Sequence, residues 1–273
     1  MTADAAAILL ARHEQLPPRA AAAARVLLLV EDPRTAGSDL ARAVGADPVL
    51  AARVLRVANS SYYGLSGRVS TLPFAVSVVG FQAVRSLAVV AAAGLDDPRG
   101  APPGFWRAAS LAATAAEALA PLTAADTGDA FCVGLLHGIG AALLHQHQAL
   151  DRICLPEVDD VHELLRGEQD RYGISHDQIG GRALAAWHLP QRLCDLIATH
   201  HEPIGADASP LARTLAGARL VADELLPGVD VDTEEFRGRL GRFVGGVPDD
   251  LDGLLGQISE RSGALLDGLA PRS

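Results

Sequence analysis

The sequence predicts an all-α protein, and three observations predict that class. Apolar residues recur at spacings of three and four along most of the 273-residue chain, which is the period of a helix with one buried face. Proline, serine or aspartate precedes many of these stretches and glycine often follows them, as at the ends of helices. No stretch shows the two-residue alternation of a strand. A chain of this length can bury a sizeable core, as one large domain or as two closely joined halves.

The N-terminal lobe that we expect covers residues 1–94 and begins with short helices. Residues 1–30 are typical of one or two helices interrupted by a Pro-Pro pair, and the second of them, AAAARVLLLV, is apolar enough to be buried. An EDP sequence ends that helix. Ser38 then caps a short helix, DLARAV, which closes at Gly45.

The next helix leads into the most distinctive part of the chain. Asp47 can cap it and Pro48 can be its first residue, because the missing N–H of proline is not needed in the first turn. Its apolar residues fall on one face, with Arg53 and Arg56 turned away. The Asn and Ser side chains of the ANSSYYG block, residues 58–64, compete for backbone hydrogen bonds and end the helix there.

Two further helices complete the lobe. One begins at Pro73 and is broken at Gly80, and the other runs from about Phe81 to Ala93, where Gly94 can close it in the left-handed conformation. Residues 95–104, LDDPRGAPPG, combine charge with three prolines and two glycines and predict a linker loop between the halves.

The second half again consists of helices. We expect a C-terminal lobe over residues 105–228 and closing helices over residues 229–273. The expected helices are FWRAASLAATAAEALA up to Pro121, a single helix from about Asp129 through GLLHGIGAALLHQH, VHELLRGEQDRYG, one from near Ser175 and His176, one from Pro190 to about His200, one from Pro210 to Leu226, and EEFRGRLGRF and PDDLDGLLGQISERSGALLDGL in the closing segment.

Charge and cysteine content exclude several classes of function. A formal net charge of −10 argues against nonspecific binding of a nucleic-acid backbone, which needs dense positive charge. All 23 basic residues are arginine, so lysine nucleophiles and Walker-type phosphate loops are excluded. Cys132, Cys154 and Cys194 are few, odd in number and far apart, which indicates a reducing cytoplasm and no disulfide framework. We interpret them as small buried apolar groups.

No segment of the sequence predicts export or membrane insertion. The N-terminus lacks the basic region and long apolar region of a signal peptide. The VLLLV run is far too short to span a bilayer. We therefore expect a soluble, cytoplasmic protein.

Several segments together resemble the HDOD family, the HD-related output domains. They are the DP pair, LAARVLRVANSSYYG and GFQAVRSL, with further similarity from LPPRAAAAARVLLLVEDP through LLHGIG to THHEP and ARLVADEL. The resemblance implies an HDOD or HD-domain-like helical fold whose C-terminal lobe is HD-like. It also implies a relationship to the HD and HD-GYP metal phosphohydrolases, a place in bacterial signalling proteins and loss of catalysis.

The resemblance places the catalytic motif of the HD enzymes where this chain has lost it. Those enzymes need an early His, an adjacent His-Asp pair and a late Asp, which together hold a divalent ion that activates water. Here the pair reads His137-Gly138, and glycine cannot ligate a cation. The early His would fall in residues 107–110, Arg-Ala-Ala-Ser, where none stands. We therefore expect no catalytic residue and no cofactor.

Five remaining side chains lie at places that resemble the ligand positions of HD-GYP-like enzymes: His137, His176, His200, His201 and Asp223. They can gather a late transition metal such as zinc, since imidazole suits it. We favour the alternative, that they persist as hydrogen-bonded core or cleft residues of an inactive site. His145 and His147 follow at the end of one helix, where we expect them on the solvent side or near the helix C-terminus.

The ANSSYYG block also has two interpretations. It can be a fold signature, in which Asn59 satisfies helix-end carbonyls or a neighbouring loop and the tyrosines wedge between helices. It can instead be a recognition surface, with exposed Tyr62, Tyr63, Arg68 and Arg85 as contact residues for a partner protein.

The residues and the resemblance together predict a noncatalytic regulatory module, a pseudoenzyme that acts through contacts with other signalling proteins. One alternative is a receptor for a nucleotide or cyclic dinucleotide, whose phosphate could bind Arg and His side chains of the remnant pocket. A residual metal-dependent phosphohydrolase is the least favoured alternative.

Overall fold

The computed structural model describes residues 21–95, 97, 99–151, 161–205, 207–226 and 233–270, with backbone alone for residues 148–151 and 233. Throughout these residues the secondary structure is helical and contains no strand, which confirms the predicted all-α class. The first expected helix, before residue 21, and Cys154 lie outside the described residues.

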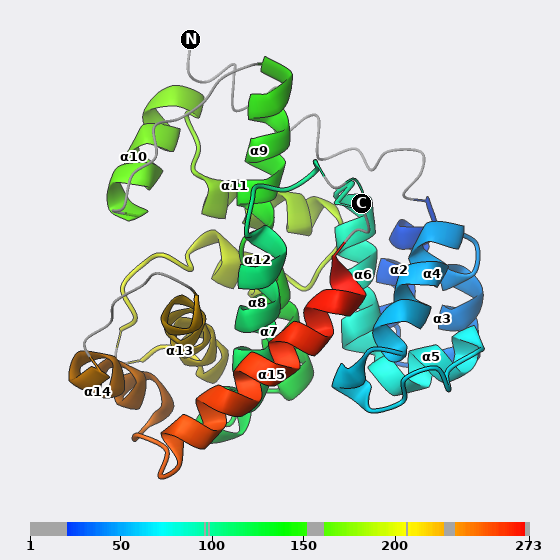
Figure 1. Cartoon of the computed structure of the whole chain (residues 1–273). Helices are drawn as coiled ribbons and strands as arrows, with labels where there is room; N and C mark the ends of the chain where they lie inside the picture. The colour runs from blue at the N-terminus through cyan, green and yellow to red at the C-terminus, as the bar shows by residue number, and fades with distance from the viewer. Residues whose placement is uncertain are drawn as a thin grey trace.

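Figure 1 shows the order and arrangement of the helices. They are α2 (Ala21–Glu31), α3 (Gly37–Val44), α4 (Pro48–Ala58), the 3-10 turn η2 (Ser61–Tyr63), α5 (Leu72–Val79), α6 (Phe81–Ala92), α7 (Phe105–Thr123), α8 (Thr127–Leu136), α9 (Ile139–Asp151), α10 (Val161–Tyr172), α11 (His176–Ala186), α12 (Gln191–Ala198), α13 (Pro210–Leu225), α14 (Thr233–Val244) and α15 (Leu251–Leu269).

Local signals set the start of α4 and its exit. The Asp47 carboxylate accepts hydrogen bonds from the backbone N–H groups of Val49, at 2.8 Å, and Leu50, as predicted for an N-cap. After the helix, Asn59 Nδ2 donates to the carbonyl oxygens of Leu55, at 3.0 Å, and Val69, at 2.7 Å. The Val69 N–H donates back to Asn59 Oδ1 at 3.0 Å. Asn59 thus joins the helix end to the following loop, which confirms its predicted role in the fold.

Several helix boundaries differ from the prediction. Ser38 was expected to cap the third helix, but it lies inside α3, whose N-cap is Ala36. The single helix expected from Asp129 onward is two helices, because α8 ends at Leu136 and α9 starts at Ile139. Gly138 lies in the break, and glycine has little helix preference. α7 continues two residues beyond Pro121 and closes at Ala124, which has a left-handed conformation with φ of 60°.

Two arginines that the sequence places on the surface are buried. Arg53 was expected to turn away from the core, but it is 3% exposed and its guanidinium lies 5.4 Å from the centre of the Trp106 ring. Arg85 would be a partner contact if the ANSSYYG block were a recognition surface, but it is 1% exposed. It donates to Glu31 Oε1 on α2 at 2.8 Å and to Asp129 Oδ1 on α8 at 3.2 Å. Arg192 at the start of α12 donates to the other oxygen of Asp129.

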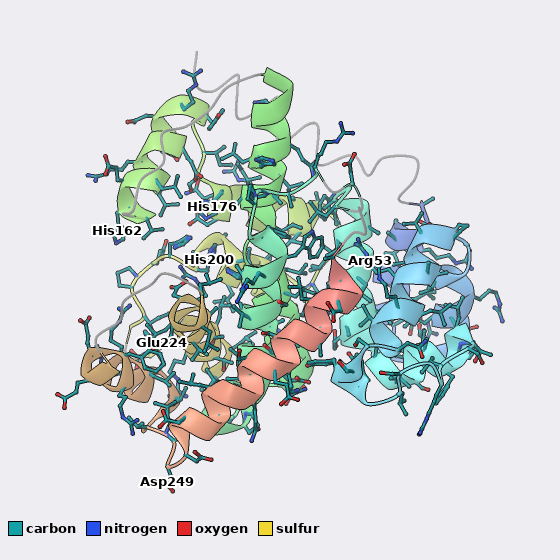
Figure 2. All side chains as sticks on the ribbon, in the orientation of Figure 1. Arg53, His162, His176, His200, Glu224 and Asp249 are labelled. Atoms are coloured by element: carbon teal, nitrogen blue, oxygen red, sulfur yellow. The ribbon has the colours of Figure 1, made fainter. Side chains whose placement is uncertain are left out.

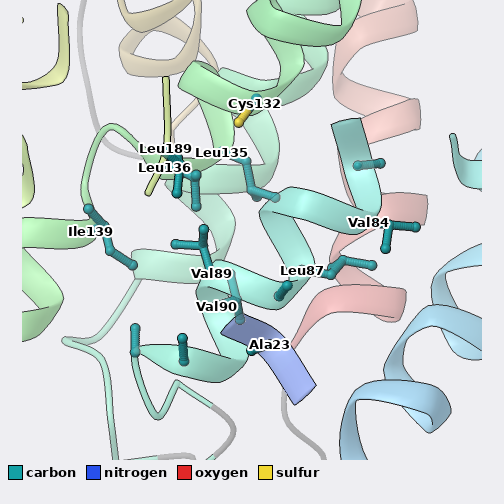
Figure 3. Packing of buried hydrophobic residues seen from close by; sticks show 14 of the residues in the cluster. Ala23, Val84, Leu87, Val89, Val90, Cys132, Leu135, Leu136, Ile139 and Leu189 are labelled. Carbon is teal, nitrogen blue, oxygen red and sulfur yellow. The ribbon is translucent and has the colours of Figure 1, made fainter. Parts of the chain in front are cut away.

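The largest hydrophobic core is continuous across the two halves of the chain. Leu87 and Val90 of α6 belong to the same cluster as Leu135 and Leu136 of α8, and all four are fully buried (Figure 3). The cluster also includes Leu265 from α15. A second cluster lies among α7, α13, α14 and α15. Figure 1 shows α15 crossing α7 and reaching α4, so this helix packs on elements from both halves.

One segment of the described residues is long and apolar enough to cross a membrane. It runs from Thr127 to His147, and 72% of its most apolar window is buried inside the protein. The pair α5 and α6 passes the same test only if a bend of 107° is ignored. Such burial is typical of a core helix, and these residues supply much of the core described above.

The backbones of α9 and α11 come into direct contact at a glycine. A Cβ atom at Gly140 would overlap the carbonyl oxygen of His176 and would lie 2.7 Å from the backbone nitrogen of Gly180. Because both neighbours are backbone atoms, no side-chain rotation can relieve the overlap. Gly140 is therefore required for α11 to lie where it does.

We predict that Gly140→Ala lowers the free energy of unfolding by about 3 kcal/mol, because α9 and α11 must move apart. Gly167→Ala is the matched control, since no atom lies within 4 Å of its Cβ position in the middle of α10. That change should raise stability by about 0.5–1 kcal/mol. Urea unfolding followed by circular dichroism measures both, and equal midpoints for Gly140→Ala and the wild type would contradict the tight contact.

Candidate functional site

Four of the five predicted remnant residues come together in the C-terminal half. His137 follows α8, His176 begins α11, and His200 and His201 follow α12. The ring centre of His200 lies 5.6 Å from that of His137, 5.8 Å from that of His176 and 4.1 Å from that of His201. Figure 2 labels His176, at the start of α11, and His200, in the segment after α12, and both are 6% exposed. We call these four side chains the histidine cluster.

His176 is held by a buried glutamate that the sequence analysis did not identify. Glu168 on α10 accepts a hydrogen bond from the backbone N–H of His176, at 2.7 Å, and another from its ring Nδ1, at 2.9 Å. The glutamate therefore fixes both the start of α11 and the orientation of the ring. Since Nδ1 carries the donated proton, Nε2 of a neutral His176 is an acceptor that faces the cluster.

His137 and His200 are oriented by carbonyl oxygens of their own helices. Nδ1 of His137 lies 2.8 Å from the oxygen of Gly134, and Nδ1 of His200 lies 2.6 Å from the oxygen of Ile197. A carbonyl oxygen only accepts, so Nδ1 is the protonated nitrogen in both rings. The Nε2 atom of each neutral ring is then an acceptor.

His201 lies between His176 and an arginine from α13. Its Nε2 is 3.0 Å from Nε2 of His176, and its Nδ1 is 2.8 Å from Nη2 of Arg219. The other terminal nitrogen of Arg219 donates to the backbone oxygen of His200. Arg219 was not among the predicted site residues. A helical arginine in a sequence is indistinguishable from a surface residue until α13 is placed beside the cluster.

The environment keeps three rings of the cluster uncharged, those of His137, His200 and His201. Burial is the largest cause, and the positive charge of Arg219 acts in the same direction. Together with the neighbouring imidazoles they lower the pKa of His137 to about 4 and that of His201 to about 3. The pKa of His200 is also well below its usual value, because of burial and then the neighbouring His137. All three rings are therefore neutral at neutral pH.

The late carboxylate expected in the site is elsewhere. Asp223 lies on α13 one turn after Arg219, and it is exposed to solvent. Asp177, next to His176, accepts hydrogen bonds from the hydroxyl of Ser175 and from the backbone N–H of Gln178 at the start of α11. Neither carboxylate joins the histidine cluster.

The cluster as arranged does not fit a divalent ion. One ligand nitrogen from each of His176, His200 and His201 lies within 4.8 Å of the others, and three imidazoles are a reasonable donor set for zinc. However, the Nε2 atoms of His176 and His201 are directed at each other at hydrogen-bonding distance, and a guanidinium lies against His201. No carboxylate of the described residues belongs to the group. Gly138 supplies no ligand, and the Phe105 ring lies 3.5 Å from where its Cβ would be.

The ANSSYYG block packs against helices from the other half of the protein. The Tyr62 hydroxyl donates to Glu117 on α7, and Arg261 on α15 donates to the same carboxylate at 2.6 Å. The Arg261 guanidinium also lies 4.6 Å from the centre of the Tyr62 ring. Tyr63 packs edge-on against Tyr62. Both tyrosines are partly buried, Arg68 is exposed and Arg85 is buried, so Arg85 was wrong as a surface contact.

The two histidines expected at a solvent-facing helix end differ from each other. His147 is 5% exposed and packs edge-on against the buried Tyr172 ring, so the expectation is wrong for this residue. His145 is partly buried and lines a hollow of about 590 Å³ with Phe105, Trp106, Arg99 and Arg107. The sequence spacing correctly predicts that the two rings point in different directions, but it does not show that His147 is buried.

Comparisons with known proteins agree on the family and the fold. The model of the HDOD domain family matches residues 16–203. A crystal structure of a candidate phosphohydrolase from Shewanella amazonensis is 24% identical, covers 97% of this chain and 98% of that chain, and has a TM-score of 0.69. An HDOD domain protein of unknown function from Geobacter sulfurreducens is 21% identical over 96% of this chain and 98% of that chain, with a TM-score of 0.64.

Two further relatives are longer than this chain. A candidate signal transduction protein from Marinobacter aquaeolei is 26% identical with a TM-score of 0.67, and the match covers 97% of this chain and 64% of that chain. An uncharacterized protein from Treponema pallidum is 25% identical over 230 residues, which is 80% of this chain and 44% of that protein. The chain therefore spans less than half the length of this curated relative.

We predict that stability falls as the pH is lowered from 6.5 towards 5. The unfolded chain takes up protons on its histidines near pH 6.5, whereas the buried rings stay neutral, so acid favours unfolding. Each ring that stays neutral contributes a slope of up to about 1.4 kcal/mol per pH unit, and the partly exposed His201 contributes less. Above about pH 7.5 these rings contribute almost no slope, because their histidines are then neutral in the unfolded chain as well.

Urea unfolding at several pH values between 7.5 and 5 measures this slope. His137→Gln should reduce it, and His145→Gln, outside the cluster, is the matched control. A free energy of unfolding that is constant or rises on acidification over this range would contradict the prediction.

Proposed function

Because the chain belongs to the HDOD domain family, we propose that it is a noncatalytic regulatory module of bacterial signal transduction, which acts through contacts with other proteins. The family is related in fold to HD phosphohydrolases, so the main alternative is hydrolysis of a phosphate ester at the histidine cluster. The proposal depends on whether that cluster can still activate water.

The observation that carries the proposal is that, among the described residues, no carboxylate belongs to the group of close ligand atoms from His176, His200 and His201. A hydrolase of the HD type needs a carboxylate beside the histidine of its motif to hold and neutralise a divalent ion. Here Gly138 follows His137, and Asp223 is exposed on α13. Arg219 places a positive charge against His201 instead. A cation beside the ligands opposes binding of a second cation, so the arrangement supports a loss of catalysis.

The comparisons support the role as a module in signalling. The match at 26% identity is to a candidate signal transduction protein, and it covers only 64% of that longer chain. The same kind of domain is thus combined with other sequence in a relative. Few cysteines and the lack of lysine-based or phosphate-loop chemistry agree with an adaptor in the cytoplasm.

Fewer residues are available for a partner contact at the ANSSYYG block than the sequence predicts. Tyr62 is engaged by Glu117 and Arg261, so its hydroxyl and ring face are already used inside the protein. Arg68, in the loop after the ANSSYYG block, is exposed and keeps its place as a candidate partner contact. Tyr63, five residues earlier in the chain, is half-buried and can supply apolar area to such a contact.

The hollow next to Phe105 favours a second function, that of a nucleotide receptor. Its volume of about 590 Å³ is in the range of small-molecule sites. The Phe105 and Trp106 rings can stack on a base, while Arg99, Arg107 and His145 can bind phosphate oxygens. The hollow does not include the histidine cluster, since none of the four histidines lines it. It lies near Gly138, because Phe105 lines the hollow and is also close to the Cβ position of Gly138.

We predict no hydrolysis of mono- and dinucleotides or cyclic dinucleotides above a protein-free blank, with Mn²⁺, Fe²⁺ or Mg²⁺ supplied. Product release by chromatography measures this for the wild type, His137→Ala and His145→Ala. Metal-dependent turnover that is lost in His137→Ala and kept in His145→Ala would overturn the noncatalytic proposal, since only His137 belongs to the cluster.

The receptor function predicts saturable heat when a nucleotide panel is titrated into the protein. Arg107→Gln should weaken binding at least about tenfold, because a charge-assisted hydrogen bond to phosphate is lost. Arg182→Gln is the matched control, since Arg182 is exposed on α11 and does not line the hollow. No heat and no thermal shift with any member of the panel would remove this function.

A further inference from the structure

Arg219 contacts two residues of the histidine cluster. One terminal nitrogen donates to the backbone oxygen of His200, and the other lies 2.8 Å from Nδ1 of His201. The side chain is partly buried, and the carboxylates of Asp223 and Asp177 are close enough to favour its charge. A guanidinium is a donor only and is always charged in proteins, so both contacts have one possible direction.

The protons of the cluster can then be assigned in one consistent chain. Nδ1 of His201 must accept from Arg219, so the proton of a neutral His201 is on Nε2. That N–H points at Nε2 of His176, 3.0 Å away. His176 can accept there because its own proton, on Nδ1, is donated to Glu168. Every ring nitrogen in the series from Glu168 to Arg219 thus has a partner of the right kind.

We propose that Arg219 is an internal cation that keeps this cluster closed to divalent metals, and that without it His176, His200 and His201 bind a late transition metal such as Zn²⁺. The inference concerns what disables the site, so it stands whether or not the module acts through a protein partner.

Two physical effects of Arg219 oppose metal binding. The first is the tautomer: a ring nitrogen that carries a proton cannot ligate, and Arg219 places that proton on the Nε2 atom of His201 that faces the cluster. The opposite tautomer would direct an N–H of His201 at an N–H of Arg219. The second effect is charge, since the guanidinium repels an ion bound on the other side of the same ring.

The remaining parts of a metal site are present. Glu168 holds the Nδ1 side of His176, as carboxylates do behind metal-binding histidines. His200 is held through its own Nδ1 and leaves Nε2 available. With Arg219 removed, His201 is free to take the tautomer that ligates. Three imidazoles and a water are a familiar coordination set for zinc, and the ligand class is therefore a late transition metal and not Mg²⁺ or Ca²⁺.

The test is a zinc titration of arginine variants, read by a competing chelator dye. Arg219→Leu removes both the charge and the donor, whereas Arg219→Gln removes the charge and keeps a donor for His201. Arg213→Leu is the matched control, because Arg213 lies on the same helix, is also partly buried and contacts the Thr123 carbonyl instead of the cluster.

We expect one zinc ion per chain in Arg219→Leu, bound about 10- to 100-fold more tightly than by the wild type or Arg213→Leu. Adding His176→Ala to Arg219→Leu should abolish this gain. An intermediate gain in zinc affinity for Arg219→Gln would show how much of the effect comes from the charge and how much from the tautomer of His201. Any division between the two effects supports the role of Arg219. Wild-type protein that binds zinc as tightly as Arg219→Leu, or a folded Arg219→Leu variant without the gain, would overturn the proposal.

A second measurement needs no variant. Nitrogen-15 NMR of the histidine rings in the wild type reports which nitrogen carries the proton. We expect the Nε2–H form for His201 and the Nδ1–H form for His176. A wild-type His201 protonated at Nδ1 would overturn the assignment even where Arg219→Leu does not fold.

Discussion

The arrangement of the helices depends on the buried ion network around Arg85. One guanidinium on α6 binds Glu31 of α2 and Asp129 of α8, and Asp129 also binds Arg192 of α12. Taking an arginine out of water has a large desolvation cost, which good geometry and more than one carboxylate must offset. Such a network does not add much net stability, but it is strongly selective, because a displaced α2 or α8 would leave a buried charge unpaired. It therefore fixes how the first helices sit on the second half.

The start and end points of most helices could be predicted because they are set by neighbours in the sequence. Asp47 with Pro48, and Gly80 between α5 and α6, determine where helices begin or end whatever packs on them. The break between α8 and α9 was missed, since its apolar pattern continues through His137 and Gly138. The burial of Arg53 and Arg85 was also missed. A charged side chain in a helix is usually exposed, and only the positions of Trp106, Glu31 and Asp129 in space reverse that expectation.

Part of the candidate site was predicted, but from the family resemblance and not from local sequence signals. His137, His176 and the pair His200-His201 are far apart in the sequence, so their spacing could not predict that they come together. Glu168 and Arg219, which decide what the rings can do, could not be found in this way. Their contacts arise from the turn between α10 and α11 and from the packing of α13, and neither carries a local pattern. Asp223 was also expected at the site, but it is exposed on α13, one turn after Arg219, and does not belong to the group of close ligand atoms.

The backbone contact between Gly140 and the His176 carbonyl has a mechanical consequence. Where two backbones touch without an intervening side chain, neither helix can yield to the other, so a shift of His176 must displace α9 as a rigid body. The same helix carries His145 at the rim of the hollow beside Phe105 and Trp106. A displacement of His176 would therefore also move His145, because both depend on the position of α9. The histidine cluster and the hollow would then be coupled through the backbone of α9.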